Sequence, residues 1–484
     1  MRIHLNKSII ICLLLSPFGF VFSQSRDLEL HISKIDSFIS QKMIENQVPG
    51  VSYVIVRDDS IVHQKAFGYA DDLGRKMSIS TPVALPAIAN SFTAIAILQL
   101  AEKGKLDLDD NVVRHLPWFT LKDKEASSQI TIRHLLLQQS GINHLDGETF
   151  FKKADTSKQA LRTLVKEFDT FSMDFDPGSK SVYSNANSGI LGLLIETISG
   201  QSFEEYVHQN ILDTLGMTDS FVNNFNPKSK NRASPHRYWF GQNTSYTPRP
   251  DRRNITGTAI FISARDAAKY MNALLQKDIR LLNKDSYAMI FDSKLEAYRE
   301  GSAFGWFRDM KNTTQFSSYG WGEGHSASIL LFTEQKVGIA VFANSVSGFA
   351  LGNVWDIVVT PGKMIQGISA NTAIPTVNYL MFAAVMLIII LFTFFIFRLL
   401  RKYFLNKPIR VPSKTNRIIS LVFCLSLAWF FIIGLPNLVS EVPIEAVFLY
   451  TPDVGWTLLL AAISALTWAL LRILIPYLTK RNYK

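Results

Sequence analysis

The sequence has 484 residues, of which 48% are hydrophobic and only 19% are charged, and its formal net charge is +10. A chain of this length can bury a sizeable core, and so apolar a composition excludes an intrinsically disordered protein. Residues 1–23 carry a net charge of +2, residues 376–484 carry +8 and residues 24–375 carry zero. Because the large middle segment has no excess of basic residues, the net charge of the chain does not support a nucleic-acid-binding protein.

The first 23 residues have the pattern of a secretory signal peptide. Arg2 and Lys7 form the positive region, residues 9–22 form the apolar region, and cleavage is expected near residue 23. An uncleaved membrane helix is the alternative, but the apolar run is short for one. We therefore predict an exported domain over residues 24–360, followed by a linker over residues 361–376.

The exported domain begins with patterns of a hairpin and a helix. Val51–Val56 and Ile61–Phe67 are short β-rich runs around a polar turn, which predicts a β-hairpin. Ser91–Lys103 predicts a helix that ends at Gly104. These elements indicate that secondary structure of both kinds alternates along the domain.

Further elements extend this alternation to the end of the domain. Three further helices are predicted, at Leu135–Gln138, Ser188–Ser199 and Arg265–Gln276. Two further strands are predicted, at Ser328–Phe332 and Val337–Phe342. Strands at both ends with helices between them predict an α/β (α+β layered) fold whose terminal strands meet in one antiparallel sheet. Residues 223–254 are polar and irregular, which indicates either a functional loop or a merely solvated one, and we favour the solvated loop.

Three apolar stretches follow, and each is long enough to span a bilayer. The predicted spans are residues 377–397, 418–438 and 454–477. The loop 398–417 holds seven basic residues and no acid, whereas the loop 439–453 holds all three acids of this region. The positive-inside rule then places loop 398–417 and tail 478–484 in the cytoplasm, and loop 439–453 outside it.

This topology predicts a protein of the cell membrane (the inner membrane) with its main domain periplasmic or otherwise extracytoplasmic. The only cysteines are Cys12, in the signal segment, and Cys424, in a span, so the exported domain has no disulfide. No His/Cys cluster has the spacing of metal ligands, and neither a metal nor a cofactor is predicted.

The order of several local patterns in the exported domain resembles the serine β-lactamase and penicillin-binding-protein superfamily, and is most like its class C β-lactamase and esterase branch. The resemblance runs from about residue 35 to about residue 358. The matching patterns are Val48-Pro49-Gly50-Val51, Phe67-Gly68-Tyr69-Ala70, Ser91-Phe92-Thr93-Ala94, Gly104-Lys105-Leu106-Asp107-Leu108, Ile130-Thr131-Ile132-Arg133-His134-Leu135-Leu136, Pro177-Gly178, Tyr183-Ser184-Asn185, Leu215-Gly216-Met217-Thr218, Ser263-Ala264-Arg265-Asp266 and Phe304-Gly305-Trp306.

The resemblance implies three catalytic elements, and the first is not intact here. The family's S-x-x-K motif places a lysine amine beside a serine hydroxyl on one helix face. In this chain the serine position is Ala87 and the lysine position is Asn90, and no serine in the sequence has a lysine three residues later. A methyl group cannot form an acyl-enzyme, so the resemblance predicts an impaired catalyst.

The second element is retained and the third is degenerate. Tyr183 and Asn185 stand at the family's spacing for proton transfer and substrate contact, which makes Tyr183 the retained catalytic residue. The K/H-[ST]-G strand corresponds to residues 319–328, and Trp321 is assigned to its basic position. We therefore predict that Asn185, Trp321, Gly322 and His325 contact a ligand.

Three hypotheses of function follow from these patterns. The first is a membrane-anchored, β-lactamase-related protein that has lost serine catalysis and binds a peptide or peptidoglycan-like ligand or a protein partner. The second is an active serine-hydrolase-type enzyme, such as a β-lactamase, esterase or peptidase, with a non-standard nucleophile. The third is a membrane sensor or scaffold in which the spans carry the function.

Overall fold

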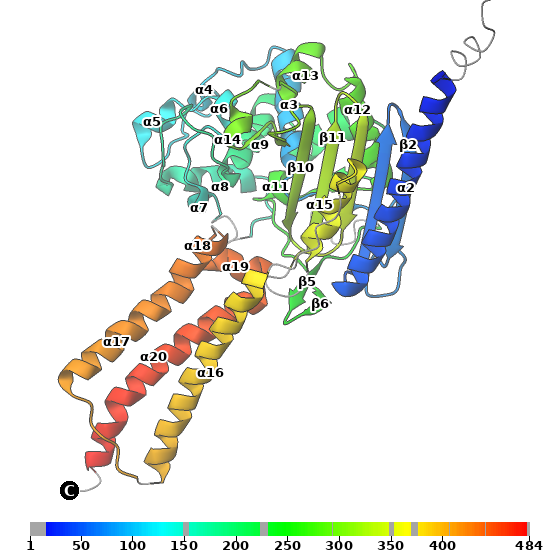
Figure 1. Ribbon diagram of the computed structural model, residues 1–484. Helices are drawn as coiled ribbons and strands as arrows, with labels where there is room; N and C mark the ends of the chain where they lie inside the picture. The colour runs from blue at the N-terminus through cyan, green and yellow to red at the C-terminus, as the bar shows by residue number, and fades with distance from the viewer. Residues whose placement is uncertain are drawn as a thin grey trace, which may run out of the picture.

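The structure is a computed structural model, and it describes residues 16–148, 154–222, 231–292, 294–347, 353–368, 376–405, 407–440 and 442–481. A mixed α/β domain lies on one end of a bundle of long apolar helices (Figure 1). The predicted α/β class with an antiparallel sheet is confirmed.

A seven-stranded antiparallel sheet forms the centre of the domain, in the order β2-β1-β12-β11-β10-β9-β8. Its strands are β1 (Gly50–Arg57), β2 (Ser60–Gly68), β8 (Ser302–Ala303), β9 (Trp306–Arg308), β10 (Gln315–Gly322), β11 (His325–Phe332) and β12 (Val337–Ala343). The first strand pairs with the last, with Val54 opposite Ala340, so the predicted meeting of the two terminal segments is confirmed. Both strands are central and buried, which explains their continuous apolar runs.

Helices cover both faces of this sheet. The helices α2 (Ser16–Glu45) and α15 (Val354–Ile365) lie on one face, where Tyr53 and Ile55 of β1 join their core cluster. The opposite face, which holds Val54 and Val56, packs on the larger cluster with α3 (Ala89–Glu102) and α12 (Ala264–Gln276). Because successive side chains of β1 point to opposite faces of the sheet, this strand contributes to two separate hydrophobic cores.

Smaller elements surround α3 and the outer edge of the sheet. One short sheet has the strand order β3 (Val83–Ala84), β7 (Ile260–Ile262) and β4 (Phe221–Val222). A second short sheet is the pair β5 (His236–Trp239) and β6 (Gln242–Ser245). The remaining helices of the domain are α4 (Val112–His115), α5 (Lys124–Ser128), α6 (Ile132–Leu136), α7 (His144–Gly147), α8 (Ala160–Lys166), η2 (Glu167–Thr170), α9 (Asn185–Ser199), α10 (Phe203–Val207), η3 (His208–Leu212), α11 (Ile255–Thr258), α13 (Lys284–Ile290) and α14 (Ala297–Glu300).

Most predicted elements of the domain occur in the structure, and the exceptions have local causes. The helix expected over 135–138 is instead α6, because Thr131 and His134 form a capping box that starts the helix earlier. The segment 223–254, predicted to be a loop, contains the hairpin of β5 and β6, while its residues 223–230 lie outside the described residues.

The C-terminal region contains three helices that are long and apolar enough to cross a membrane, at Leu380–Phe404, Lys414–Leu438 and Pro452–Pro476. Its elements are α16 (Thr376–Phe404), α17 (Lys414–Trp429), η4 (Phe430–Gly434), α18 (Leu435–Ser440), α19 (Ile444–Tyr450) and α20 (Pro452–Arg481). The short helix α19 was not predicted. The predicted signal segment falls partly on residues 1–15, outside the described residues, and its residues 16–23 belong to α2, so its cleavage stays a prediction.

Candidate functional site

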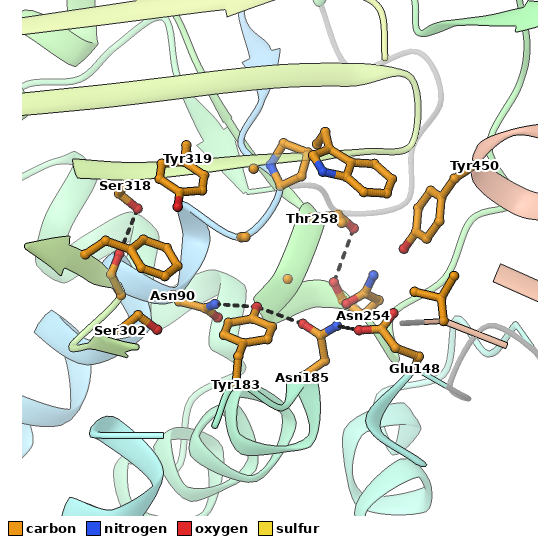
Figure 2. Close-up of a pocket in the computed structure, with 18 of the residues that line it drawn as sticks. Asn90, Glu148, Tyr183, Asn185, Asn254, Thr258, Ser302, Ser318, Tyr319 and Tyr450 are labelled. Atoms are coloured by element: carbon orange, nitrogen blue, oxygen red, sulfur yellow. Dashed lines mark hydrogen bonds between the residues drawn. The ribbon is translucent and has the colours of Figure 1, made fainter. Parts of the chain in front are cut away.

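A cavity of about 360 Å³ opens between the domain and the segment that joins the second and third apolar helices. Its wall combines the start of α3, the start of α9, the edge strands β8 to β10 and the helix α19 (Figure 2). The aromatic members of the lining are Phe307, Tyr319, Trp321, Trp355 and Tyr450. The polar members are Asn90, His144, Glu148, Tyr183, Asn185, Asn254, Thr258, Ser302 and Ser318, and the others are Pro86, Ala87, Gly257, Gly305, Gly320 and Val442.

Ala87 lies in the cavity wall just before α3. Its backbone has a φ of 58°, in the left-handed region that residues with a Cβ rarely adopt. The N–H of Ala87 donates to the carbonyl oxygen of Gly257 at 2.9 Å. Ala87 therefore offers the cavity a methyl group, and its backbone donor is already engaged by Gly257 rather than available to stabilise an oxyanion.

Asn90 begins a chain of hydrogen bonds along the cavity floor. The Asn90 Nδ2 donates to the Tyr183 hydroxyl at 3.1 Å, and that hydroxyl donates to Asn185 Oδ1 at 2.9 Å. The Asn185 Nδ2 in turn donates to Glu148 Oε1 (Figure 2). The predicted residues Asn90, Tyr183 and Asn185 are thus brought together, and the proton of Tyr183 is directed toward Asn185.

Tyr183 is held in its neutral form by this environment. Burial raises the pKa of Tyr183 to about 12; the charge of Glu148 adds to this rise, while the hydrogen bond from Asn90 opposes it. A tyrosine acts as a general base only as its phenolate, which is scarce near neutral pH at such a pKa. With an amide at position 90 in place of an ammonium group, no neighbouring cation lowers that pKa.

Glu148 ends the chain and was not predicted as a site residue. The residue is only 7% exposed, and burial raises the pKa of its carboxyl, against the opposing effects of His144 and the Asn185 amide. His144 Nδ1 lies 2.9 Å from the carbonyl oxygen of Tyr183. Neither residue belongs to a motif in the sequence, because α7 is one turn long and has no periodic pattern.

The strand β10 approaches Ala87 most closely at Gly320. A Cβ at Gly320 would lie 1.9 Å from the Pro86 carbonyl oxygen and 2.8 Å from the Ala87 Cβ, so only glycine fits there. Ser318, two residues earlier on β10, also lines the cavity, and its hydroxyl donates to the Gly305 carbonyl at 2.7 Å. The assignment of Trp321 to the basic position of a K/H-[ST]-G strand stays a prediction.

The other predicted ligand contacts divide between two places. Trp321 lines the cavity and meets the Tyr450 ring at a centroid distance of 5.1 Å and an interplanar angle of 79°. Gly322 ends β10 beside Tyr450 but is not in the cavity lining. His325 lies in a separate cavity of about 100 Å³, where burial lowers its pKa to about 3, so its position does not support the predicted contact with a ligand beside Trp321.

Two residues of the inter-helix segment, Val442 and Tyr450, also line the cavity and were not predicted. The sequence placed them in a connecting loop with no chemical motif, and only the packing of the bundle against the domain reveals them. Within the described residues, no group of three His, Cys, Asp or Glu side chains could hold a metal ion.

Comparisons with known proteins give a consistent family. The Beta-lactamase family model matches residues 35–358. Protein flp of Staphylococcus aureus (strain N315) is 29% identical over 315 residues, which are 64% of this chain and 62% of that protein. The putative penicillin-binding protein PbpX of Bacillus subtilis (strain 168) is 32% identical over 245 residues, covering 49% of this chain and 57% of that protein. The matched part is therefore less than two thirds of the length of either relative.

Solved structures show the same fold. The octameric penicillin-binding protein homologue from Pyrococcus abyssi has a TM-score of 0.59 and 25% identity, with 71% of this chain and 79% of that chain covered. FmtA from Staphylococcus aureus has a TM-score of 0.58 and 20% identity, with 71% and 91% covered.

Proposed function

The chain belongs to the Beta-lactamase family, and from this premise we propose that its cavity binds a ligand without acyl transfer, in a domain held at a membrane by the three apolar helices. The observation that carries the proposal is the cavity floor at Ala87 and Asn90. A serine hydroxyl and a lysine amine there would supply the nucleophile and its base, but a methyl group and an amide supply neither.

The remaining polar groups of the floor are suited to hold a ligand and not to transform it. Tyr183 carries a proton that already points to Asn185, and the Ala87 N–H is bound to Gly257. A buried chain of this kind orients its members rigidly, because each would lose a hydrogen bond on moving. The cavity thus keeps the family's shape for a peptide or peptidoglycan-like ligand, or for a segment of a protein partner.

The location that we propose is the cell membrane (the inner membrane), with the domain on its extracytoplasmic or periplasmic side after cleavage of the signal peptide. The basic loop 398–417 supports this orientation, since basic loops remain in the cytoplasm. The short α19 between the second and third helices would then lie on the same side as the domain, which is where the cavity requires it.

A fluorescent penicillin tests the loss of acyl transfer. The full-length protein in detergent is incubated with the probe, denatured and examined for covalent fluorescence on a gel. We expect no labelling of the native sequence, and weak labelling of the double variant Ala87→Ser with Asn90→Lys, which restores both groups of the motif. Covalent labelling of the native sequence would overturn the proposal.

An active hydrolase with another nucleophile is the competing function, because the hydroxyls of Ser302 and Ser318 also line the cavity. The Ser318 hydroxyl donates to a backbone carbonyl, and the neutral Tyr183 is no base for either serine. If the native protein were labelled, the variants Ser302→Ala and Ser318→Ala would identify the nucleophile. The third candidate function is a membrane sensor, and the observation that favours it is the contact of α19 with the cavity.

A further inference from the structure

The segment between the second and third apolar helices is fixed to the domain at the mouth of the cavity. The Arg237 Nη1 donates to the Leu449 carbonyl at 3.2 Å, and the Phe240 N–H donates to Asp453 Oδ2 at 3.2 Å. Between these two hydrogen bonds, the Tyr450 ring packs edge to face with Trp321. The hairpin of β5 and β6 thus holds α19 so that Tyr450 becomes part of the cavity wall (Figures 1 and 2).

The charged residues around the cavity are few and of one sign. Among the described residues, no lysine or arginine lines it, and its acidic member is the buried Glu148. The Asn90 Oδ1 is a buried acceptor without a hydrogen-bond partner. The lining therefore offers an acidic group and no lysine or arginine, whereas a carboxylate-binding site would present such cations.

The aromatic residues of the cavity wall can attract a cation. The rings of Trp321 and Tyr450 form an edge-to-face pair in the cavity wall, with an interplanar angle of 79° and centroids 5.1 Å apart. The face of an aromatic ring carries negative potential and attracts cations within about 6 Å of its centroid. Trp321 is 47% exposed, so its ring is available at the mouth of the cavity.

We propose that this cavity binds a cationic ammonium group between the corner of Trp321 and Tyr450 and the Glu148 carboxylate, and that it excludes anions. The membrane region of the chain thereby contributes a specificity-determining residue, Tyr450, to the site of the domain. The inference rests on the proposed function as a binding site and names the charge of its ligand.

Exclusion of anions follows from desolvation. A carboxylate that enters this space loses water and meets no lysine or arginine among the described lining residues, whereas an ammonium group meets the acidic Glu148 and two aromatic rings. We expect the cavity to bind a cationic ligand at least about tenfold more tightly than an anionic ligand of the same shape, which corresponds to about 1.4 kcal/mol.

Thiol reagents of opposite charge test the proposal without knowledge of the ligand. Cys12 and Cys424 are replaced by serine in the full-length protein, and a single cysteine is introduced at Ala87. Its rate of modification is measured with the trimethylammonium-ethyl and the sulfonato-ethyl methanethiosulfonates. Both reagents react with the same thiolate, so the ratio of their rates does not depend on the pKa of that cysteine.

The matched control is a cysteine at Leu73, which is 95% exposed in a turn on the domain surface. We expect the cationic-to-anionic rate ratio at Ala87→Cys to exceed that at Leu73→Cys by at least about tenfold. Adding Glu148→Gln should reduce this excess. Adding Tyr450→Ala should also reduce this excess at position 87 and leave the ratio at position 73 unchanged, whereas Tyr450→Phe, which keeps the aromatic ring, should preserve the ratio at both positions.

A ratio at Ala87→Cys equal to or below the control ratio would overturn the proposed charge selectivity. A rate ratio at position 87 that is the same with and without Tyr450→Ala would overturn the role of the membrane region. Ser302→Cys, at another wall of the same cavity, repeats the measurement if Ala87→Cys fails to fold, and no reaction at either position would show that the cavity does not admit a ligand. Penicillin labelling of the native protein would contradict only the loss of acyl transfer, so the two failures are distinguishable.

Discussion

Glu323 and His325 flank the turn between β10 and β11, and burial opposes the charge of each. Burial raises the pKa of Glu323 to about 7 and lowers the pKa of His325 to about 3. His325 Nδ1 lies 3.1 Å from the Glu323 carbonyl oxygen. The two residues therefore share a small cavity in which neutral forms are stable, and the free energy of unfolding depends on pH through both.

Glu323→Gln should make the protein more stable at high pH. The folded protein holds the Glu323 proton more tightly than the unfolded chain, so the native glutamate loses stability as the pH rises from about 4.5 to about 7. Glutamine does not titrate, and the difference between variant and native protein should grow over this range and level off above it, at about 2 kcal/mol after allowance for partial exposure.

The measurement is thermal unfolding of both proteins in detergent between pH 4.5 and pH 8.5. His325 titrates in both, so its own contribution, which is lost as the pH falls from about 6.5 toward 3, cancels in the comparison. A difference in unfolding temperature that is constant with pH would show that Glu323 is not buried as described.

Sequence spacing was sufficient for some site residues and not for others. Tyr183 and Asn185 were predicted because they match the spacing of the family's second motif, and Ala87 and Asn90 because they occupy the serine and lysine positions of its S-x-x-K motif. All four line the cavity. Glu148 has no such neighbour, and its importance arises from burial beside Asn185, which a single sequence does not encode locally.

At the scale of elements, the contact between β10 and the start of α3 fixes the shape of the cavity. Gly320→Ala should destabilise the protein strongly, because its Cβ would lie 1.9 Å from the Pro86 carbonyl oxygen and backbone would have to move. We expect a loss of at least about 3 kcal/mol in the free energy of unfolding, in the range of severe overpacking.

The matched control is Gly322→Ala, two residues along the same strand. A Cβ there would have its nearest neighbours at 3.5 Å, which is an ordinary contact, so its effect should be about 1 kcal/mol or less. Urea or thermal unfolding of the two variants makes the comparison. Equal losses for both would mean that β10 does not approach Ala87 as closely as described.

The predictability of the elements followed their length and local sequence pattern. The hairpin of β1 and β2, the helix α3 and the strands β11 and β12 have β-rich or apolar runs of several residues, and each was predicted. The short strands β8 and β9 and the hairpin of β5 and β6 lie at the sheet edge or outside it, and their residues carry no regular alternation. Tertiary contacts, not local propensity, determine such strands.

At the scale of the whole molecule, the domain and the apolar bundle each have their own core and meet at α19. The bundle packs through clusters around Phe431 and Cys424 that share no residue with those of the domain. The sequence predicted both parts correctly but could not predict their contact, because Arg237 and Leu449 are distant in the chain and neither has a pattern that points to the other. The cavity therefore depends on the arrangement of the complete chain.

The orientation that we propose for the bundle in a membrane draws on the same contact together with the basic loop. Residues 398–417 hold seven basic residues and no acid, and such loops stay on the cytoplasmic side, where anionic lipids attract them. In a background without Cys12 and Cys424, we expect Leu73→Cys to react with an impermeant maleimide in right-side-out vesicles, and Lys407→Cys to react only in inverted vesicles. Both positions are exposed, so access alone decides the result.

The opposite pattern would place the domain in the cytoplasm and remove the argument for a secretory signal. Reaction of both positions in the same vesicles would mean that the chain crosses the membrane an even number of times between them. That second outcome is not compatible with a cavity lined by Tyr450, because the apolar helix Lys414–Leu438 lies between Lys407 and Tyr450 and would carry Tyr450 to the side opposite the domain. With α16 as the single crossing between Leu73 and Lys407, the second helix returns the chain to the side of the domain, and Tyr450 can then reach Trp321.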